Sequence, residues 1–91
     1  MESGAIIPQI SIRFDVAMAI MNRARGMITS RIAEVSGQNH AAADALRVKR
    51  RNLLVVQQSL TPDQAERVEA MIAEWGPRVL DTGLLWQEVE R

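Results

Sequence analysis

The stretch VAMAIMNRARGMITSRIAEV, residues 16–35, places apolar side chains at steps of three and four residues. This spacing puts them on one face of a helix of about five turns, and the stripe consists of Ala17, Met21, Ala24, Ile28, Ile32 and Val35. Gly26 interrupts the pattern at a cost of about 1 kcal/mol relative to alanine, so it marks a kink, a close helix contact or a break between two shorter helices. The sequence therefore predicts a mainly α fold.

A second helix is predicted from His40 to Leu60, because Gly37 offers a stop for the first helix and Asn39 a cap for the next. Its apolar residues follow a heptad pattern, and a cation on the seam restricts register or the choice of partner. The two helices are expected to form a hairpin. We interpret the seam as a candidate dimer or partner interface, made of Leu46, Lys49, Leu53, Val56 and Leu60.

A third helix is predicted to begin at Thr61, because Thr61 and Gln64 have the spacing of a capping box. The pair Gly76–Pro77 has the order that ends a helix. This helix is expected to fold back over the hairpin. The remaining tail predicts a short fourth helix capped by Thr82, with Leu85, Trp86 and Val89 facing inward.

The N-terminal segment has a different pattern. ISIRF, residues 10–14, alternates apolar and polar side chains, which predicts a short half-buried strand after a flexible arm over residues 1–9. Asp15 can cap the helix that follows. A lone strand needs a partner, which a second copy would supply unless the segment packs as extended chain. We therefore expect one domain, residues 1–91: a helical hairpin, a third helix and a short C-terminal helix, with an extended N-terminal segment.

The composition argues against catalysis and against a metal or cofactor site. The chain has no cysteine or tyrosine and one histidine, and it lacks the nucleophile-elbow and phosphate-loop motifs. His40 and Asp44 lie one helical turn apart, but two ligands do not complete a zinc site. We expect no catalytic residue, no metal and no cofactor. The chain also lacks a secretory signal pattern and an apolar run of about 20 residues, so we expect a cytoplasmic protein without a membrane span.

The net charge is zero, but the charges are unevenly distributed. Residues 13–51 carry eight basic against three acidic side chains, and residues 52–91 carry three basic against seven acidic ones. Within the basic part Arg47, Arg50 and Arg51 share one helix face, away from the seam. Such a face either contacts nucleic acid phosphates or pairs with acidic neighbours. We adopt the second interpretation, with partners on the third helix: Glu66, Glu69 and Glu74.

PQISIRFD, residues 8–15, resembles the start of ribbon–helix–helix DNA-binding proteins. The resemblance implies that the strand pairs antiparallel with its copy in a dimer, and that the resulting ribbon enters the major groove. It implies that Gln9, Ser11 and Arg13 point outward and read bases, since Gln can pair with adenine and Arg with guanine. In this interpretation the DNA backbone is held by Arg47, Arg50 and Arg51.

Two hypotheses on function follow from the sequence. The first is a non-enzymatic, small cytoplasmic interaction protein, an adaptor or regulatory accessory factor, that forms a homodimer and presents helix faces to a protein partner. The alternative is a dimeric transcriptional regulator of ribbon–helix–helix type, with nucleic acid as its partner.

Overall fold

The computed structural model describes residues 3–90, and the side chains from Ile12 onward. The described chain is all-α and contains no strand. Its helices, in chain order, are α1 (Ser3–Val35), α2 (His40–Ser59), α3 (Ala65–Leu80) and α4 (Thr82–Val89).

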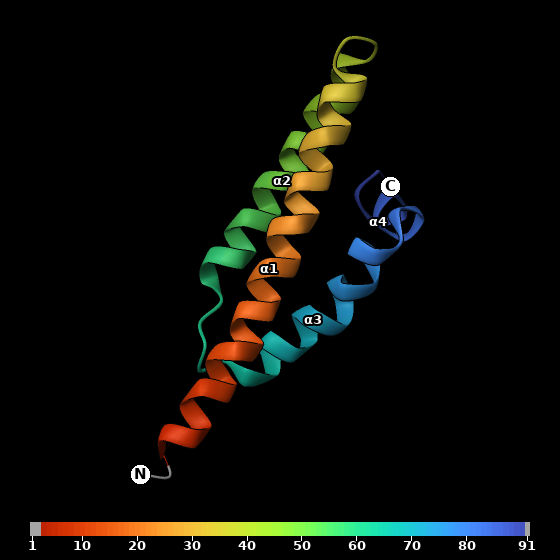
Figure 1. Ribbon diagram of the computed structural model, residues 1–91. Coiled ribbons are helices and arrows are strands. Elements are labelled where there is room, and N and C mark those ends of the chain that lie inside the picture. Colours follow the sequence, from red (N-terminus) through yellow and green to blue (C-terminus); the bar gives the residue numbers. More distant parts are fainter. Residues whose placement is uncertain (1–2, 91) are drawn as a thin grey trace.

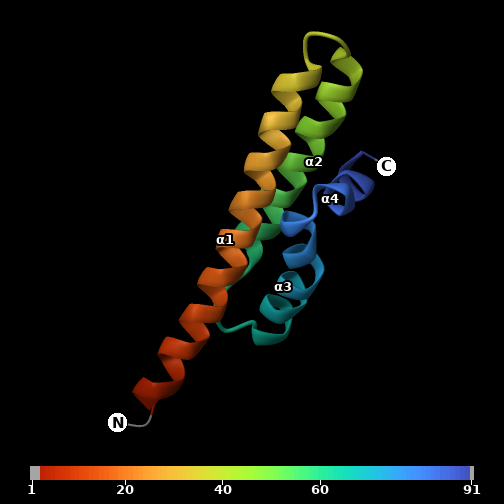
Figure 2. The same ribbon diagram turned by 45° about the vertical axis from the view of Figure 1, so that its right-hand side comes forward.

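α1 is the central helix of an elongated molecule measuring 58 × 22 × 17 Å. α2 returns antiparallel along α1, and α3 then packs on another side of α1 and diverges from α2 (Figures 1 and 2). α4 packs on α3 at the end of the chain. The predicted hairpin, the third helix folded over it and the short fourth helix are therefore confirmed.

The core is aliphatic and is centred on the apolar stripe of α1. Ala17, Met21, Ala24 and Ile28 have no exposed surface, and Ile32 is 7% exposed. α2 and α3 each bury one face against α1, and α4 packs on α3. The other buried apolar residues are Ala43, Leu46, Leu53, Leu60, Val68, Met71, Trp75, Val79, Leu85 and Val89. The heptad leucines Leu46, Leu53 and Leu60 therefore pack within the chain, so the surface they were expected to offer a second copy is already covered.

The N-terminal segment differs from the expected strand where it can be compared. α1 includes Ile12, Arg13 and Phe14 as helix, and Asp15 lies inside the helix, where it cannot be a cap. The side chains of residues 3–11, with the predicted base-reading Gln9 and Ser11, lie outside the described part. A helix satisfies its own backbone hydrogen bonds, whereas a single strand leaves them unpaired.

Gly26 causes no interruption, because α1 continues through it to Val35. It is exposed, and a Cβ added there would meet no atom within 4 Å. Neither a break nor a close helix contact explains this glycine.

The cap of α2 is confirmed, because Asn39 Oδ1 accepts a hydrogen bond from the Ala42 N–H at 3.0 Å.

The start of α3 is later than predicted. Gln64 Oε1 accepts from the Thr61 N–H at 3.0 Å, which is the return bond of a capping box, but the helix begins only at Ala65. Thr61 and Gln64 therefore close a turn before the helix.

The predicted end of α3 at Gly76–Pro77 is wrong, because the helix continues to Leu80. Gly76 has no Cβ to clash with the ring of Pro77, so the pair can stay helical at the cost of one backbone hydrogen bond. The extra turn buries Val79, which is 6% exposed. α4 begins at Thr82, so the predicted Thr82 cap is wrong; the cap is Asp81, whose Oδ1 accepts from the Gly83 N–H at 2.9 Å.

Candidate functional site

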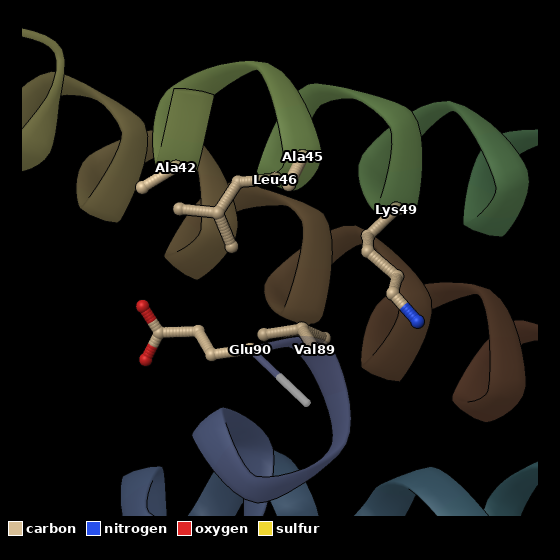
Figure 3. Close-up of a pocket in the computed structure, with 6 residues that line it drawn as sticks. All are labelled: Ala42, Ala45, Leu46, Lys49, Val89 and Glu90. Carbon is tan, nitrogen blue, oxygen red and sulfur yellow. The ribbon is translucent and has the colours of Figure 1, made fainter. Parts of the chain in front are cut away.

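A groove lies between α2 and the C-terminal end of the chain. It contains two adjoining pockets of about 210 and 200 Å³. The first is lined by Ala42, Ala45, Leu46, Lys49, Val89 and Glu90, and Figure 3 shows its α2 residues facing Val89 and Glu90. The second is lined by Lys49, Asn52, Leu53, Val56, Trp75, Glu88 and Val89. Because both pockets share Lys49 and Val89, we treat them as one feature, the α2–α4 groove.

The groove is formed where helix packing leaves α2 partly uncovered. Leu46 and Leu53 turn one side of α2 toward α1, and Lys49 and Val56 lie on the adjacent side at steps of three and four residues. Val56 is 39% exposed. Of the five residues predicted as an interface, these two are thus the ones that reach the surface, whereas the leucines form the groove floor or the core.

Lys49 is the unusual residue of this groove. Its side chain extends from α2 toward the α4 side of the pocket (Figure 3). Within the described part of the chain it forms no hydrogen bond or ion pair. The neighbouring carboxylates are held by arginines: Glu90 Oε2 accepts from Arg31 Nε and Glu88 Oε1 from Arg78 Nη2, both at 3.2 Å. The groove therefore carries a positive charge in largely apolar surroundings.

Ion pairs and aromatic contacts hold the α4 side of the groove in place. Arg78 lies over the ring of Trp75, 4.5 Å from its centre, and also bonds Glu74. Arg31 of α1 lies 5.6 Å from the centre of the Trp86 ring. A guanidinium over an aromatic face is attractive, most strongly over tryptophan. The Arg31–Trp86 contact joins α4 to α1 and the Arg78–Glu88 ion pair joins α4 to α3, which fixes the groove wall.

A second feature is a polar pocket of about 250 Å³ between α1 and α2, which we call the arginine pocket. It is lined by Arg25, Arg47, Arg50, Arg51 and Leu54. Arg47 Nη1 donates to Asp44 at 2.7 Å, and Arg50 Nη1 donates to the Thr29 hydroxyl at 2.9 Å. The structure therefore gathers the three arginines of the predicted cationic face around one cavity and adds a fourth.

The predicted pairing of these arginines with acids of the third helix is wrong. Glu69 pairs with Arg13 and Glu74 with Arg78. Glu66 is exposed and contacts none of the arginines of the pocket within the described residues. α3 packs on a different side of α1 from the arginines, so its acids do not reach them.

Arg25 belongs to a polar network in the α1–α2 interface. Its Nη1 donates to Gln57 Oε1 at 2.9 Å and to Asn22 Oδ1 at 3.1 Å. Gln57, which is 9% exposed, also donates to Asn22 Oδ1 at 2.8 Å. These acceptors are neutral, so they fix the guanidinium without cancelling its charge. Arg25 Nε is buried and has no hydrogen-bond partner.

Arg13 joins α1 to α3 through a two-bond ion pair. Its Nε and Nη2 donate to the two carboxylate oxygens of Glu69 at 2.7 and 2.6 Å. The hydrogen bonds and the charge of Arg13 lower the pKa of Glu69, and the same contacts raise the pKa of Arg13. Within this chain the proposed base-reading side chain is engaged by a carboxylate.

Arg25 and the groove residues of the C-terminal half were not anticipated from the sequence. Arg25 was identifiable in principle, since a hairpin that turns at residues 36–39 brings Arg25 opposite the region around Arg50. Val89 was expected to face inward, but no pattern in the sequence shows where α3 and α4 diverge from α2.

The described residues contain no group of three or more histidine, cysteine, aspartate or glutamate side chains placed to hold a metal ion. No helix in the described part is long and apolar enough to cross a membrane.

Comparison with known protein families, with curated proteins and with solved structures found no match to this chain.

Proposed function

We propose that this chain is a non-enzymatic, cytoplasmic helical interaction protein, and that the α2–α4 groove receives an amphipathic helix of a partner protein. The observation that carries the proposal is Lys49, whose ammonium group has no hydrogen-bond or ion-pair partner among residues 3–90 and lies in an otherwise mainly apolar groove. The expected partner helix has an apolar stripe with an acidic residue beside it.

The lining of the groove suits the apolar stripe of a helix. Ala42 and Ala45 are small and permit close approach, and Val56 and Trp75 supply apolar surface further along. A helix laid in an apolar groove is a recurrent mode of recognition, in which residues at steps of three, four and seven are the anchors.

The charge of Lys49 favours a partner over a second copy in this groove. Two α2 helices packed symmetrically about Lys49 would bring like charges together, which opposes association. An acidic residue on the partner would instead neutralise the ammonium group where water is partly excluded. The expected homodimer stays a prediction. Outside the groove, the apolar side chains of α2 that a second copy could contact are Val48 and Val55, which are 58 and 59% exposed.

A charge-reversal experiment tests the groove. Two fluorescein-labelled helical peptides of about four turns carry leucines at i, i+3, i+4 and i+7, and one has glutamate where the other has lysine beside the stripe. We expect the native chain to prefer the glutamate peptide in anisotropy titrations, and Lys49→Glu to prefer the lysine peptide. An unchanged preference in Lys49→Glu would remove the proposed role of Lys49.

Two valine variants provide the matched control. Val56→Glu places a charge in the groove, and Val55→Glu places the same charge on the neighbouring exposed position. Binding should weaken with Val56→Glu and persist with Val55→Glu. Equal loss in both variants, or no binding of either peptide to the native chain, would refute the groove as a docking site. Sedimentation equilibrium of the native chain and of Val55→Glu tests the homodimer in the same series.

The ribbon–helix–helix alternative stays a hypothesis with its own test. If Arg13 reads bases, Arg13→Ala should abolish sequence-specific DNA binding while the protein remains folded. Binding that survives this substitution would contradict the alternative. The interaction hypothesis is preferred because Arg13 is already paired with Glu69.

A further inference from the structure

The arginine pocket is separate from the α2–α4 groove. At 3.6 residues per turn, Arg47 and Arg51 lie about 160° around α2 from Lys49. The two features therefore occupy opposite sides of one helix. A ligand in one leaves the other accessible.

The pocket contains more positive charge than the described side chains neutralise. Arg47 has Asp44 as its partner, but Arg25, Arg50 and Arg51 have no carboxylate partner within the described residues. Arg50 is bonded to a hydroxyl, and Arg25 to side-chain amide oxygens. Like charges gathered in this way repel one another and create a strongly positive local potential, which an anion relieves.

Two of the guanidinium groups are held in position before any ligand arrives. Gln57 and Asn22 fix Arg25, and Thr29 fixes Arg50. A side chain that is already ordered loses less conformational entropy when it binds. The buried Nε of Arg25 is in addition a donor without an acceptor, which is costly unless a ligand or water accepts from it.

We propose that the arginine pocket binds a phosphate group. The planar guanidinium fork donates two parallel hydrogen bonds to phosphate oxygens, and several forks around one cavity suit a group with more than one negative charge. A carboxylate carries one charge and would leave most of the pocket unneutralised. The phosphate comes either from the backbone of a nucleic acid or from a free oligophosphate.

Binding of defined probes to matched variants tests this site. The probes are inorganic tripolyphosphate, measured by calorimetry, and labelled mixed-sequence duplex DNA, measured by anisotropy at low and at physiological salt. Arg51→Gln is the principal variant, because Arg51 makes no hydrogen bond or ion pair with the described residues and its replacement breaks no internal interaction. Lys49→Gln removes the same charge from the other side of α2 and is the control.

We expect Arg51→Gln to lower the affinity about tenfold, the size of one hydrogen bond to a charged group. For DNA, the slope of log affinity against log salt should become shallower by about 0.9 for each phosphate that Arg51 neutralises in the native chain. Lys49→Gln should retain most of the affinity. Circular dichroism verifies that both variants remain helical.

Each outcome decides the proposal. Binding of tripolyphosphate alone identifies a free oligophosphate as the source, and binding of DNA that tripolyphosphate does not displace identifies a nucleic acid backbone. Displacement of DNA by tripolyphosphate supports the phosphate site for both. The proposal is overturned if neither probe binds at low salt, if Arg51→Gln binds as tightly as the native chain, or if polyglutamate competes as well as tripolyphosphate does.

Discussion

Replacing Gly26 with alanine should stabilise the protein. Gly26 is exposed inside α1, it has no positive φ, and an added Cβ would meet no atom within 4 Å. The full difference in helix propensity, about 1 kcal/mol, should therefore be gained without an offsetting clash. For a domain of this size, that free energy raises the melting temperature by about 4–8 °C.

The measurement is thermal and urea unfolding followed by circular dichroism at 222 nm. We expect the urea midpoint to rise with no change in the slope of the unfolding free energy against urea. A melting temperature that stays the same or falls would mean that α1 is not helical through Gly26, and the reasoning would fail.

Gly76→Ala is the matched comparison. Its Cβ would lie 3.9 Å from Ile20 Cδ1, an ordinary contact, but it would also precede Pro77 inside α3. The proline ring crowds the Cβ of the residue before it in a helix, so the gain in propensity should be cancelled or reversed. Equal stabilisation by both substitutions would show that Pro77 imposes no such restriction.

Three further predictions concern the core, the polar network and the ion pair between α1 and α3. Leu46→Ala should lower the free energy of unfolding by about 2–3 kcal/mol, which is the low end for a buried leucine. The loss stays low because Leu46 borders the groove, so water can fill the space left by the side chain. A loss below about 1 kcal/mol in urea unfolding would contradict the burial of Leu46. Gln57→Ala should cost about 1–3 kcal/mol, since it removes an acceptor from the part-buried Arg25, and Gln57→Glu should recover part of this loss by supplying a charged acceptor. The hydrogen bonds and charge of Arg13 hold the pKa of Glu69 below its ordinary value of 4.5. The pair's contribution to stability is therefore complete above pH 4.5 and is lost as the pH falls through the lowered pKa. Glu69→Gln should make the urea midpoint less sensitive to pH in this acidic range, and an unchanged acid dependence would show that the Arg13–Glu69 pair does not cause it.

The helices were predictable where one periodic signal was strong. The stripe from Ala17 to Val35 and the leucines of α2 fixed two helices and their packing, because a buried face repeats at helical spacing. Boundaries that depend on one or two residues were predicted less well, as at both ends of α3. Gly76–Pro77 reads as a helix end in isolation, but burial of Val79 outweighs that local preference.

The candidate sites were predictable only in part, because each is formed by residues from separate helices. Arg47, Arg50 and Arg51 were recognised as one face from their spacing, yet Arg25 joins them only through the register of the hairpin. Lys49 was recognised as a cation on the seam. The groove around Lys49 exists because α3 leaves α1 at an angle. Side-chain packing between the helices sets this angle, and no local sequence pattern predicts it.

The role of α1 as the common support has a consequence for the order in which the protein opens. α2 packs on α1, α3 packs on α1 and α4 packs on α3, whereas α2 has little backbone contact with α3 or α4. The α1–α2 hairpin is joined by a short turn, and its contacts span less sequence than those between α1 and α3: Gln57–Asn22 is separated by 35 residues and Arg13–Glu69 by 56. Smaller separations favour more rapid formation. The α3–α4 pair can then detach and reattach as a separate cooperative unit. Backbone amides of α3 and α4 should exchange with deuterium before those of α1 and α2, and a ligand that bridges the groove should slow this exchange by joining the two units.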